Sequence, residues 1–247
     1  MSRSLSSLYG GRGISLAWGR GSRVFDSNGN EYLDFFNGHG AALFGHANET
    51  LTRALTEASS HLWSCGAGFE SSVREELADE LGSLIGGGRV FFANSGTEAI
   101  EAALKLAAVL RPGRKRILAC RRAFHGRSCG ALSVTFNPKY RAPFASLIPH
   151  AEHFNPEALA EHIDKDTFAV FVEPVQGEGG VFPIEPEVGR TISEACRANG
   201  AILIADEVQT GLGRCGAPLA APLAGLSPDI TCVAKGLAGG LPAGAVI

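Results

Sequence analysis

The chain has 247 residues, of which 45% are hydrophobic, and such a chain can bury the core of one large α/β domain or two small ones. Charged residues make up 19% and the formal net charge is −3, which excludes the basic surface needed to bind nucleic acid or anionic lipid. No apolar run approaches the roughly 18 residues of a membrane helix, and residues 1–10 contain no hydrophobic signal core, so we expect a cytoplasmic protein without membrane contact.

The first part of the chain is rich in turns. Asn28-Gly29 separates the short runs 24–26 and 32–34, and this pattern predicts a β-hairpin. Apolar residues then recur at three- and four-residue spacing over 49–62 and 71–85. That period predicts two amphipathic helices, the second of which ends at a run of three glycines.

From residue 89 onward, short apolar runs alternate with helical stretches. The expected strands cover 89–93, 116–120, 168–172, 201–205 and 230–234, and the expected helices cover 97–110, 156–162 and 187–199. This alternation predicts an α/β fold, in which a mainly parallel sheet has helices on both faces and follows a small N-terminal β segment. We expect residues 1–48 to be the N-terminal segment of a small domain and residues 49–247 to form a large domain.

Residues 241–247 begin another apolar run, which has two interpretations. The plainer one is a last strand that completes the sheet. The other is that the chain is a fragment whose C-terminal domain is missing. On the second interpretation we expect the chain alone not to be a competent enzyme.

Polar residues that follow the expected strands are the candidates for a ligand site, because ligands of open parallel sheets bind at the carboxyl ends of strands. Asn94-Ser95-Gly96-Thr97-Glu98 follows the first of these strands and opens a helix. Ser95 and Glu98 form a capping box, and Gly96 lets a ligand approach the backbone, as a phosphate site requires. An ordinary helix cap explains these residues equally well.

Three further strand ends carry polar residues. Phe124-His125-Gly126-Arg127 combines an aromatic ring with a guanidinium that can bind a carboxylate, although a core Phe and a surface Arg are the simpler interpretation of this motif alone. Glu173 and Glu178 lie in a glycine-rich loop, which indicates the lining of a site. Asp206 leaves a buried strand, where its carboxylate needs a partner.

Lys235 is the only one of the five lysines that ends an apolar strand. Partial burial lowers the pKa of an ammonium group and makes the neutral amine a usable nucleophile, whereas a lysine whose head group reaches solvent is the plainer alternative. Together the strand ends offer a phosphate cradle, an aromatic ring, a carboxylate and an amine. Pyridoxal phosphate needs these groups.

The motifs resemble those of the class III, fold type I aminotransferases, in order and in approximate separation, from about Gly19 to Ile247. The segments that carry the resemblance are 94–99, 123–127, 173–180, 205–214 and 234–236. Within the class, the chain is most similar to the acetylornithine aminotransferase group and its acetyl-lysine and carrier-protein-linked relatives. The resemblance implies transfer of the terminal amino group of an acylated diamine to 2-oxoglutarate through a pyridoxal phosphate Schiff base, in arginine or lysine biosynthesis.

The resemblance also implies a role for individual residues and a homodimer. Lys235 would form the Schiff base and move the proton, and Asp206 would pair with the pyridinium nitrogen. The other implied cofactor contacts are Ser95, Gly96 and Thr97 at the phosphate, Phe124 and Val208 on the two ring faces, His125 in the same motif, and Gln209 at the ring hydroxyl. The implied substrate contacts are Arg127 at the α-carboxylate, Glu173 and Glu178 near the substrate, and His39 near its entry.

Two features depart from the family pattern. His39 stands where ornithine aminotransferases carry an aromatic residue, which resembles the carrier-protein-linked branch, and a plain turn residue explains His39 equally well. Family members also run well past this length. Their later phosphate-contacting Thr, which comes from the partner subunit, and their C-terminal carboxylate-binding Arg have no counterpart here.

Other functions fit the sequence less well. A nicotinamide dehydrogenase needs G-x-G-x-x-G after its first strand and a phosphate-loop hydrolase needs G-x-x-x-x-G-K-S/T, and neither motif is present. The six cysteines form no C-x-x-C pair, which predicts reduced thiols and no metal site. Inside the class, 4-aminobutyrate and ornithine aminotransferases and glutamate-semialdehyde aminomutases share these motifs, and a non-catalytic cofactor-binding fragment is a further alternative.

Overall fold

The computed structural model describes residues 11–66 and 68–247. It begins with a three-stranded antiparallel sheet made of β1 (Leu16–Arg20), β2 (Arg23–Asp26) and β3 (Glu31–Leu33). The predicted hairpin is confirmed, with Val24 opposite Tyr32, and β1 adds an unpredicted strand to it. Residues 1–10, where the sequence contains no signal core, lie outside the described residues.

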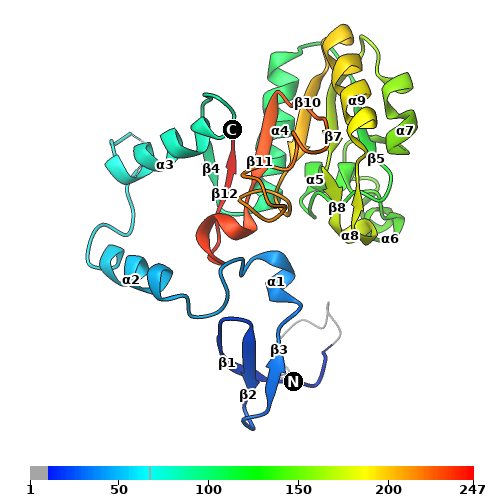
Figure 1. Cartoon of the computed structure of the whole chain (residues 1–247). Helices are drawn as coiled ribbons and strands as arrows, with labels where there is room; N and C mark the ends of the chain where they lie inside the picture. Colours follow the sequence, from blue (N-terminus) through cyan, green and yellow to red (C-terminus); the bar gives the residue numbers. More distant parts are fainter. Residues whose placement is uncertain (1–10, 67) are drawn as a thin grey trace.

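Three helices connect this small sheet to the rest of the molecule (Figure 1). They are α1 (Asn37–Gly40), α2 (Glu49–Ala58) and α3 (Ser72–Ser83). The side chain of Asn48 caps α2 by accepting hydrogen bonds from the N–H groups of Thr50 and Leu51. Helices α2 and α3 both span fewer residues than predicted. Because α2 has no buried residue, little packing extends these helices beyond their caps.

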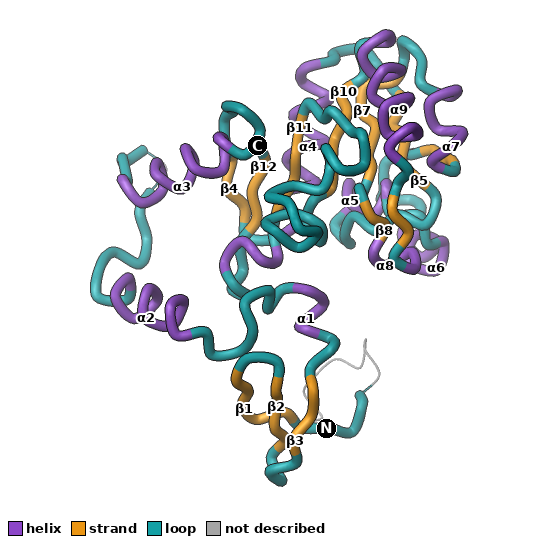
Figure 2. Tube along the Cα trace, in the orientation of Figure 1, coloured by secondary structure: helices purple, strands orange, loops and turns teal. Residues whose placement is uncertain are grey.

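A seven-stranded sheet forms the main body, with the order β4-β12-β11-β10-β7-β5-β6 (Figure 2). Its strands are β4 (Phe91–Ala93), β5 (Arg116–Cys120), β6 (Glu152–Phe154), β7 (Thr167–Val172), β10 (Ile202–Asp206), β11 (Ile230–Val233) and β12 (Gly244–Val246). The pairs from β11 to β6 are parallel, as predicted. The apolar run near the last residues forms β12, which is antiparallel to both of its neighbours, β11 and β4.

Helices cover both faces of this sheet, which confirms the predicted α/β fold (Figure 1). On one face lie α4 (Gly96–Leu110) and α5 (Cys129–Val134), and on the other lie α7 (Pro156–Leu159) and α9 (Pro186–Asn199). Alternate strand residues point to opposite faces, so that in β10 Ile202 and Ile204 pack in the cluster with α4, whereas Leu203 packs in the cluster with α9.

Short elements complete the chain. They are α6 (Pro138–Arg141), β8 (Val175–Gln176), α8 (Gly177–Gly180), β9 (Phe182–Pro183) and the 3-10 helices Ala142–Phe144, Ala160–His162 and Lys235–Ala238. Among the described residues, no helix combines the length and apolar character that crossing a membrane requires.

Candidate active site

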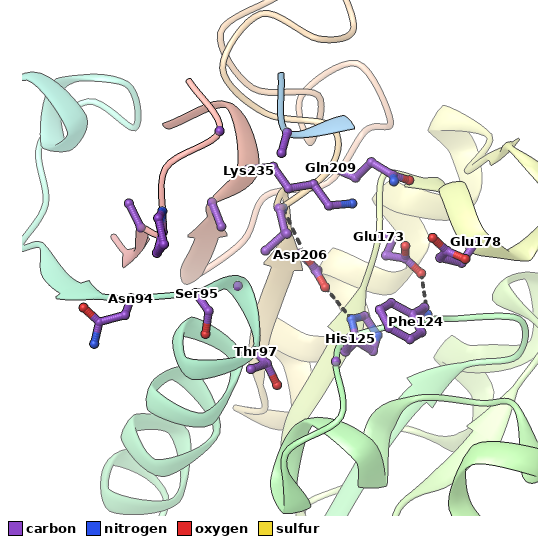
Figure 3. A pocket seen from close by; sticks show the side chains of 18 of the residues that line it. Asn94, Ser95, Thr97, Phe124, His125, Glu173, Glu178, Asp206, Gln209 and Lys235 are labelled. Carbon is purple, nitrogen blue, oxygen red and sulfur yellow. Dashed lines mark hydrogen bonds and ion pairs between the residues drawn. The ribbon is translucent and has the colours of Figure 1, made fainter. Parts of the chain in front are cut away.

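A cavity of about 470 Å³ lies at the carboxyl ends of the central strands, within the size range typical of small-molecule sites (Figure 3). It is lined by all nine residues that the resemblance associates with the cofactor: Ser95, Gly96, Thr97, Phe124, His125, Asp206, Val208, Gln209 and Lys235. Glu173 and Glu178 line it as well, but Arg127 and His39 do not. The strand-end pattern therefore brings together segments that lie up to 140 residues apart in the sequence.

The beginning of α4 forms one wall of the cavity. Ser95 caps this helix by accepting a hydrogen bond from the N–H of Glu98 at 3.3 Å, and the Glu98 carboxylate accepts one from the N–H of Asn94 at 2.6 Å. A Cβ added at Gly96 would lie 2.7 Å from Cγ1 of Val208, so only glycine lets these two segments approach each other so closely. The amide groups of the first turn and the helix dipole suit an anion such as phosphate.

Asp206 and His125 form a buried ion pair at the base of the cavity, drawn as a dashed line in Figure 3. Nδ1 of His125 lies 2.7 Å from Oδ2 of Asp206, and Oδ1 accepts a hydrogen bond from the N–H of Val208. Burial disfavours the charged imidazolium, yet the hydrogen bond and the charge of Asp206 hold the pKa of His125 above its ordinary value. The pair fixes the Asp206 carboxylate at the base of the cavity, and a protonated pyridine nitrogen needs a carboxylate partner there.

Lys235 follows β11 and begins a 3-10 helix. Its φ of +46° is in the left-handed region, which is strained for a residue with a side chain and is often associated with functional sites. Burial lowers the pKa of its ammonium group. The charges of nearby carboxylates, the strongest of which is that of Asp206, act in the opposite direction and offset only part of this effect. Figure 3 shows the side chain extending over the cavity beside Gln209.

Glu173 is a second buried carboxylate in this site. Its Oε2 accepts a hydrogen bond from the N–H of Phe124 at 3.0 Å and so fixes the start of the segment that carries the aromatic ring. Burial raises the pKa of Glu173 to about 7. The charge of His125 opposes this rise, and the charge of Asp206 adds a smaller contribution to it. Glu178 lies farther along the same loop and faces the cavity in Figure 3.

Close packing fixes the loop that carries Gln209. A Cβ added at Gly177 would lie 1.4 Å from Oε1 of Gln209, so the amide crosses directly over a glycine. Thr210 donates a hydrogen bond to Glu207, which is itself buried and also accepts the N–H of Ala221. These contacts hold the loop after β10 against the segment that leads to β11.

Two predicted substrate residues lie outside the cavity lining. Arg127 directly follows Gly126, which does line the cavity, and its guanidinium lies over the ring of Tyr140 at 4.1 Å from the centroid. His39 is exposed and packs edge-on against Phe36 at 4.2 Å. Ala41, two residues farther along the chain, lines the cavity, and a place for His39 near the substrate entry stays a prediction.

Several lining residues had not been predicted. They are Ala41, Asn94, Gly126, Ala234 and the turn Gly240, Leu241, Pro242 and Ala243. The turn lies beside the site because β12 returns between β11 and β4. The positive φ of Gly239 and Gly240 marks the reversal, and the paired glycines are the signal that could have located it.

The donor set fits pyridoxal phosphate. A helix start for a phosphate, an aromatic ring beside an aliphatic side chain, a buried carboxylate and a buried amine meet in one cavity. Within the described part of the chain, no group of three His, Cys, Asp or Glu side chains is placed to hold a metal ion.

Comparisons with known proteins agree with this geometry. The family model for class-III aminotransferases matches residues 12–247. An acetylornithine aminotransferase of Bacillus cereus is 41% identical over 250 residues, and a [LysW]-aminoadipate semialdehyde/glutamate semialdehyde transaminase of Sulfurisphaera tokodaii is 39% identical over 243 residues. These matches cover 100% and 97% of this chain, and 64% and 62% of the respective relatives.

Solved structures of aminotransferases also resemble this chain. An ornithine aminotransferase of Toxoplasma gondii superimposes with a TM-score of 0.91 at 33% identity, over 99% of this chain and 60% of its own. An N-acetylornithine aminotransferase of Stenotrophomonas maltophilia superimposes with a TM-score of 0.79 at 33% identity, over 96% of this chain and 62% of its own. The chain thus spans somewhat less than two thirds of the proteins it matches, and over that span it belongs to the class III aminotransferases.

Proposed function

We propose that the chain contains the cofactor site of a pyridoxal-phosphate-dependent aminotransferase, which moves the terminal amino group of an acylated diamine to 2-oxoglutarate. The donor is acetylornithine or a related lysine or ornithine precursor, as in the relatives named acetylornithine aminotransferase and LysW-aminoadipate semialdehyde transaminase. The terminal carbon of the donor loses its amino group and becomes an aldehyde. The keto oxygen of 2-oxoglutarate is replaced by that amino group, which gives glutamate.

The observation that carries this proposal is the meeting of one partly buried amine with one buried carboxylate–imidazole pair. Lys235 and Asp206 line the same cavity, and Asp206 is held by His125 at 2.7 Å. The lowered pKa of Lys235 favours the neutral amine that must attack a carbonyl. A nucleotide-binding or purely structural role does not explain why Lys235 and the Asp206–His125 pair line the same cavity.

Each of these residues would have its own role in the reaction. When bound, pyridoxal phosphate supplies an aldehyde for an incoming amine and a protonated ring that accepts the electrons of a carbanion. Gly96 and Thr97 would hold its phosphate at the start of α4, and Phe124 and Val208 would bind the two faces of its ring. Asp206 would keep the proton on the ring nitrogen. Nζ of Lys235 would accept the proton from the substrate carbon and deliver it to the carbon on the other side of the transferred nitrogen.

The test is to express the chain, load it with pyridoxal phosphate and measure glutamate formed from 2-oxoglutarate. Acetylornithine, acetyl-lysine, ornithine and 4-aminobutyrate serve as donors, each at the same concentration. The proposal expects the acylated diamines to give the highest kcat/KM. A preference for 4-aminobutyrate would move the chain to another branch of the class. The absence of transfer with every donor would contradict activity of this chain alone, as the fragment interpretation expects, and the visible absorbance of bound pyridoxal phosphate then tests the cofactor site.

The proposal also includes a homodimer, residues 1–48 as part of a small domain, and a cytoplasmic location. An apolar hollow of about 630 Å³ beside β4 and α4, where Phe91 is 62% exposed, supports burial by a second copy. All six cysteines are free thiols, which supports a reducing compartment. Light scattering, limited proteolysis near residue 48 and cell fractionation test the three statements.

A further inference from the structure

One aromatic residue contacts both halves of the candidate site. The ring of Tyr140 meets the ring of Phe124 edge to face, with centroids 6.2 Å apart and planes at 80°. The guanidinium carbon of Arg127 lies over the same Tyr140 ring at 4.1 Å from its centroid. Phe124 lines the cavity, whereas Arg127 lies just outside its lining, so Tyr140 connects a ring in the cavity to a cation at its margin.

Tyr140 is fixed with respect to the segment that carries both of its partners. It lies in α6, which begins at a proline and is capped by the side chain of Asn137. The N–H of Phe136 donates to the carbonyl of Ala123 at 2.8 Å. The hydroxyl of Thr135 accepts the N–H of His125 and donates to the carbonyl of Gly126. These bonds hold residues 123–126 and 135–141 together on either side of the ring.

Stacking of this kind suits a carboxylate-binding arginine. An arginine side chain has several rotatable bonds, and ordering it on binding costs free energy. A guanidinium whose face lies on an aromatic ring is already ordered, and it presents its N–H groups in a defined plane. Arg127 is exposed, and the ring of Tyr140 lies against the face of its guanidinium.

We propose that Tyr140 is a positioning residue of the substrate site, which holds the Arg127 guanidinium at a fixed place relative to Phe124 and so sets where the substrate carboxylate binds. This inference rests on the proposed function, because it takes Arg127 as the carboxylate-binding group. It adds that Tyr140, which is not among the residues that line the cavity, contributes to the spacing between the carboxylate and the cofactor ring.

The first test compares Tyr140→Leu with Tyr140→Phe in the full chain loaded with pyridoxal phosphate. Leucine removes the ring, whereas phenylalanine keeps both the face and the edge. For a carboxylate-bearing donor, Tyr140→Leu should raise KM roughly 3- to 30-fold and change kcat little, and Tyr140→Phe should stay within about threefold of the parent. An alkylamine without a carboxylate should show no such difference. Phe144→Leu, in the same segment and 49% exposed, is the matched control.

A binding measurement separates this inference from the proposed function. Glutarate has two carboxylates and neither an amine nor a keto group, so calorimetric titration with glutarate reports carboxylate binding without turnover. Arg127→Gln and Tyr140→Leu should both weaken glutarate binding, and Tyr140→Phe should restore it. Equal affinity in the parent and Tyr140→Leu would overturn the inference even if transfer activity is normal. Weaker glutarate binding in Arg127→Gln and Tyr140→Leu, but not in Tyr140→Phe, would support the inference even if no donor is turned over.

A third measurement remains useful if Tyr140→Leu does not fold. Phenylalanine analogues with one, two and three ring fluorines, placed at position 140, progressively weaken the negative face of the ring at nearly constant volume. The affinity for glutarate should fall with each added fluorine. A constant affinity across the series would show that the ring acts only by filling space, and the inference would be wrong.

Discussion

Lys235 is placed to carry the cofactor by its backbone as much as by its burial. Its left-handed φ turns the chain at the end of β11. We predict that borohydride reduction of the chain loaded with pyridoxal phosphate leaves a stable pyridoxyl group on Nζ of Lys235, because this lysine lines the cavity and its pKa is lowered by burial. Peptide mass mapping locates the label. Lys105, in α4 and outside this cavity lining, is the internal control, and a label on it in place of Lys235 would refute the assignment.

Asp206 is expected to act through its charge. Asp206→Asn keeps the shape and a hydrogen-bonding oxygen for His125, whereas Asp206→Ala removes both. Because a neutral side chain no longer keeps the pyridine nitrogen protonated, we expect both variants to bind the cofactor and to lose on the order of 10²–10³-fold in kcat. Single-turnover absorbance measurements separate cofactor binding from the proton-transfer step. Near-parental rates in Asp206→Asn would show that charge is not the contribution of this residue.

Glu173 makes stability depend on pH. Its pKa is raised from 4.5 to about 7 in the folded chain, so the neutral form is favoured by folding. The stability that it contributes is therefore fully present below about pH 4.5 and is lost as the pH rises through about 7. We expect the cofactor-free parent to lose on the order of 1–3 kcal/mol more than Glu173→Gln between pH 5 and pH 8. Urea unfolding at both pH values measures this, and equal losses in the two proteins would contradict it.

The sequence located most of the site residues for a simple reason. Parallel strands end at one edge of the sheet, so a polar residue after each buried strand must lie near the others, and Asp206 and Lys235 follow this rule. Tyr140 does not follow a strand, and its contacts arise only when α6 folds back on residues 123–127. No local pattern in the sequence encodes that approach.

At the scale of elements, α9 depends on one small residue. Gly189 faces the loop after residue 220, and a Cβ added there would lie 1.9 Å from the carbonyl oxygen of Ala224. We expect Gly189→Ala to destabilise the chain by about 1–3 kcal/mol, because the loop must move away from a well-packed helix. Urea unfolding measures the loss. Glu194→Ala, on the exposed side of the same helix, should stay within about 0.5 kcal/mol, and equal effects of both variants would contradict the packing argument.

Elements with a long, regular period were predicted best. The expected helix over 187–199 and the expected strand over 116–120 agree with α9 and β5 to within one residue. The buried positions of α9 recur at three- and four-residue spacing, and β5 is a run of four consecutive buried residues. The sequence did not reveal α5, whose six residues include five buried ones on nearly all sides. It also missed β8 and β9, which are two residues long and too short to show any period.

At the scale of the molecule, the alternation of strands and helices indicates an α/β sheet but not the order of its strands. Consecutive parallel strands favour neighbouring positions, as for β10 and β11, which a connection of turns and loops joins. The position of β12 depends on an antiparallel return through the short 3-10 helix Lys235–Ala238. This strand inserts between strands that lie about 140 residues apart in sequence. Only the completed pairing with both β4 and β11 determines where it lies.

The insertion of β12 has a consequence for the time at which the site is assembled. Within the described residues, β4 is hydrogen-bonded to the sheet through β12 alone, and β4 leads directly into the turn at Ser95, where we propose that the phosphate binds. During synthesis, residues 91–93 therefore wait as an unpaired strand until residues 244–246 have left the ribosome, a delay of roughly 10–30 s at 5–20 residues per second. The chain exposes an aggregation-prone strand edge for that interval, and a chaperone that covers Phe91 would be most needed then.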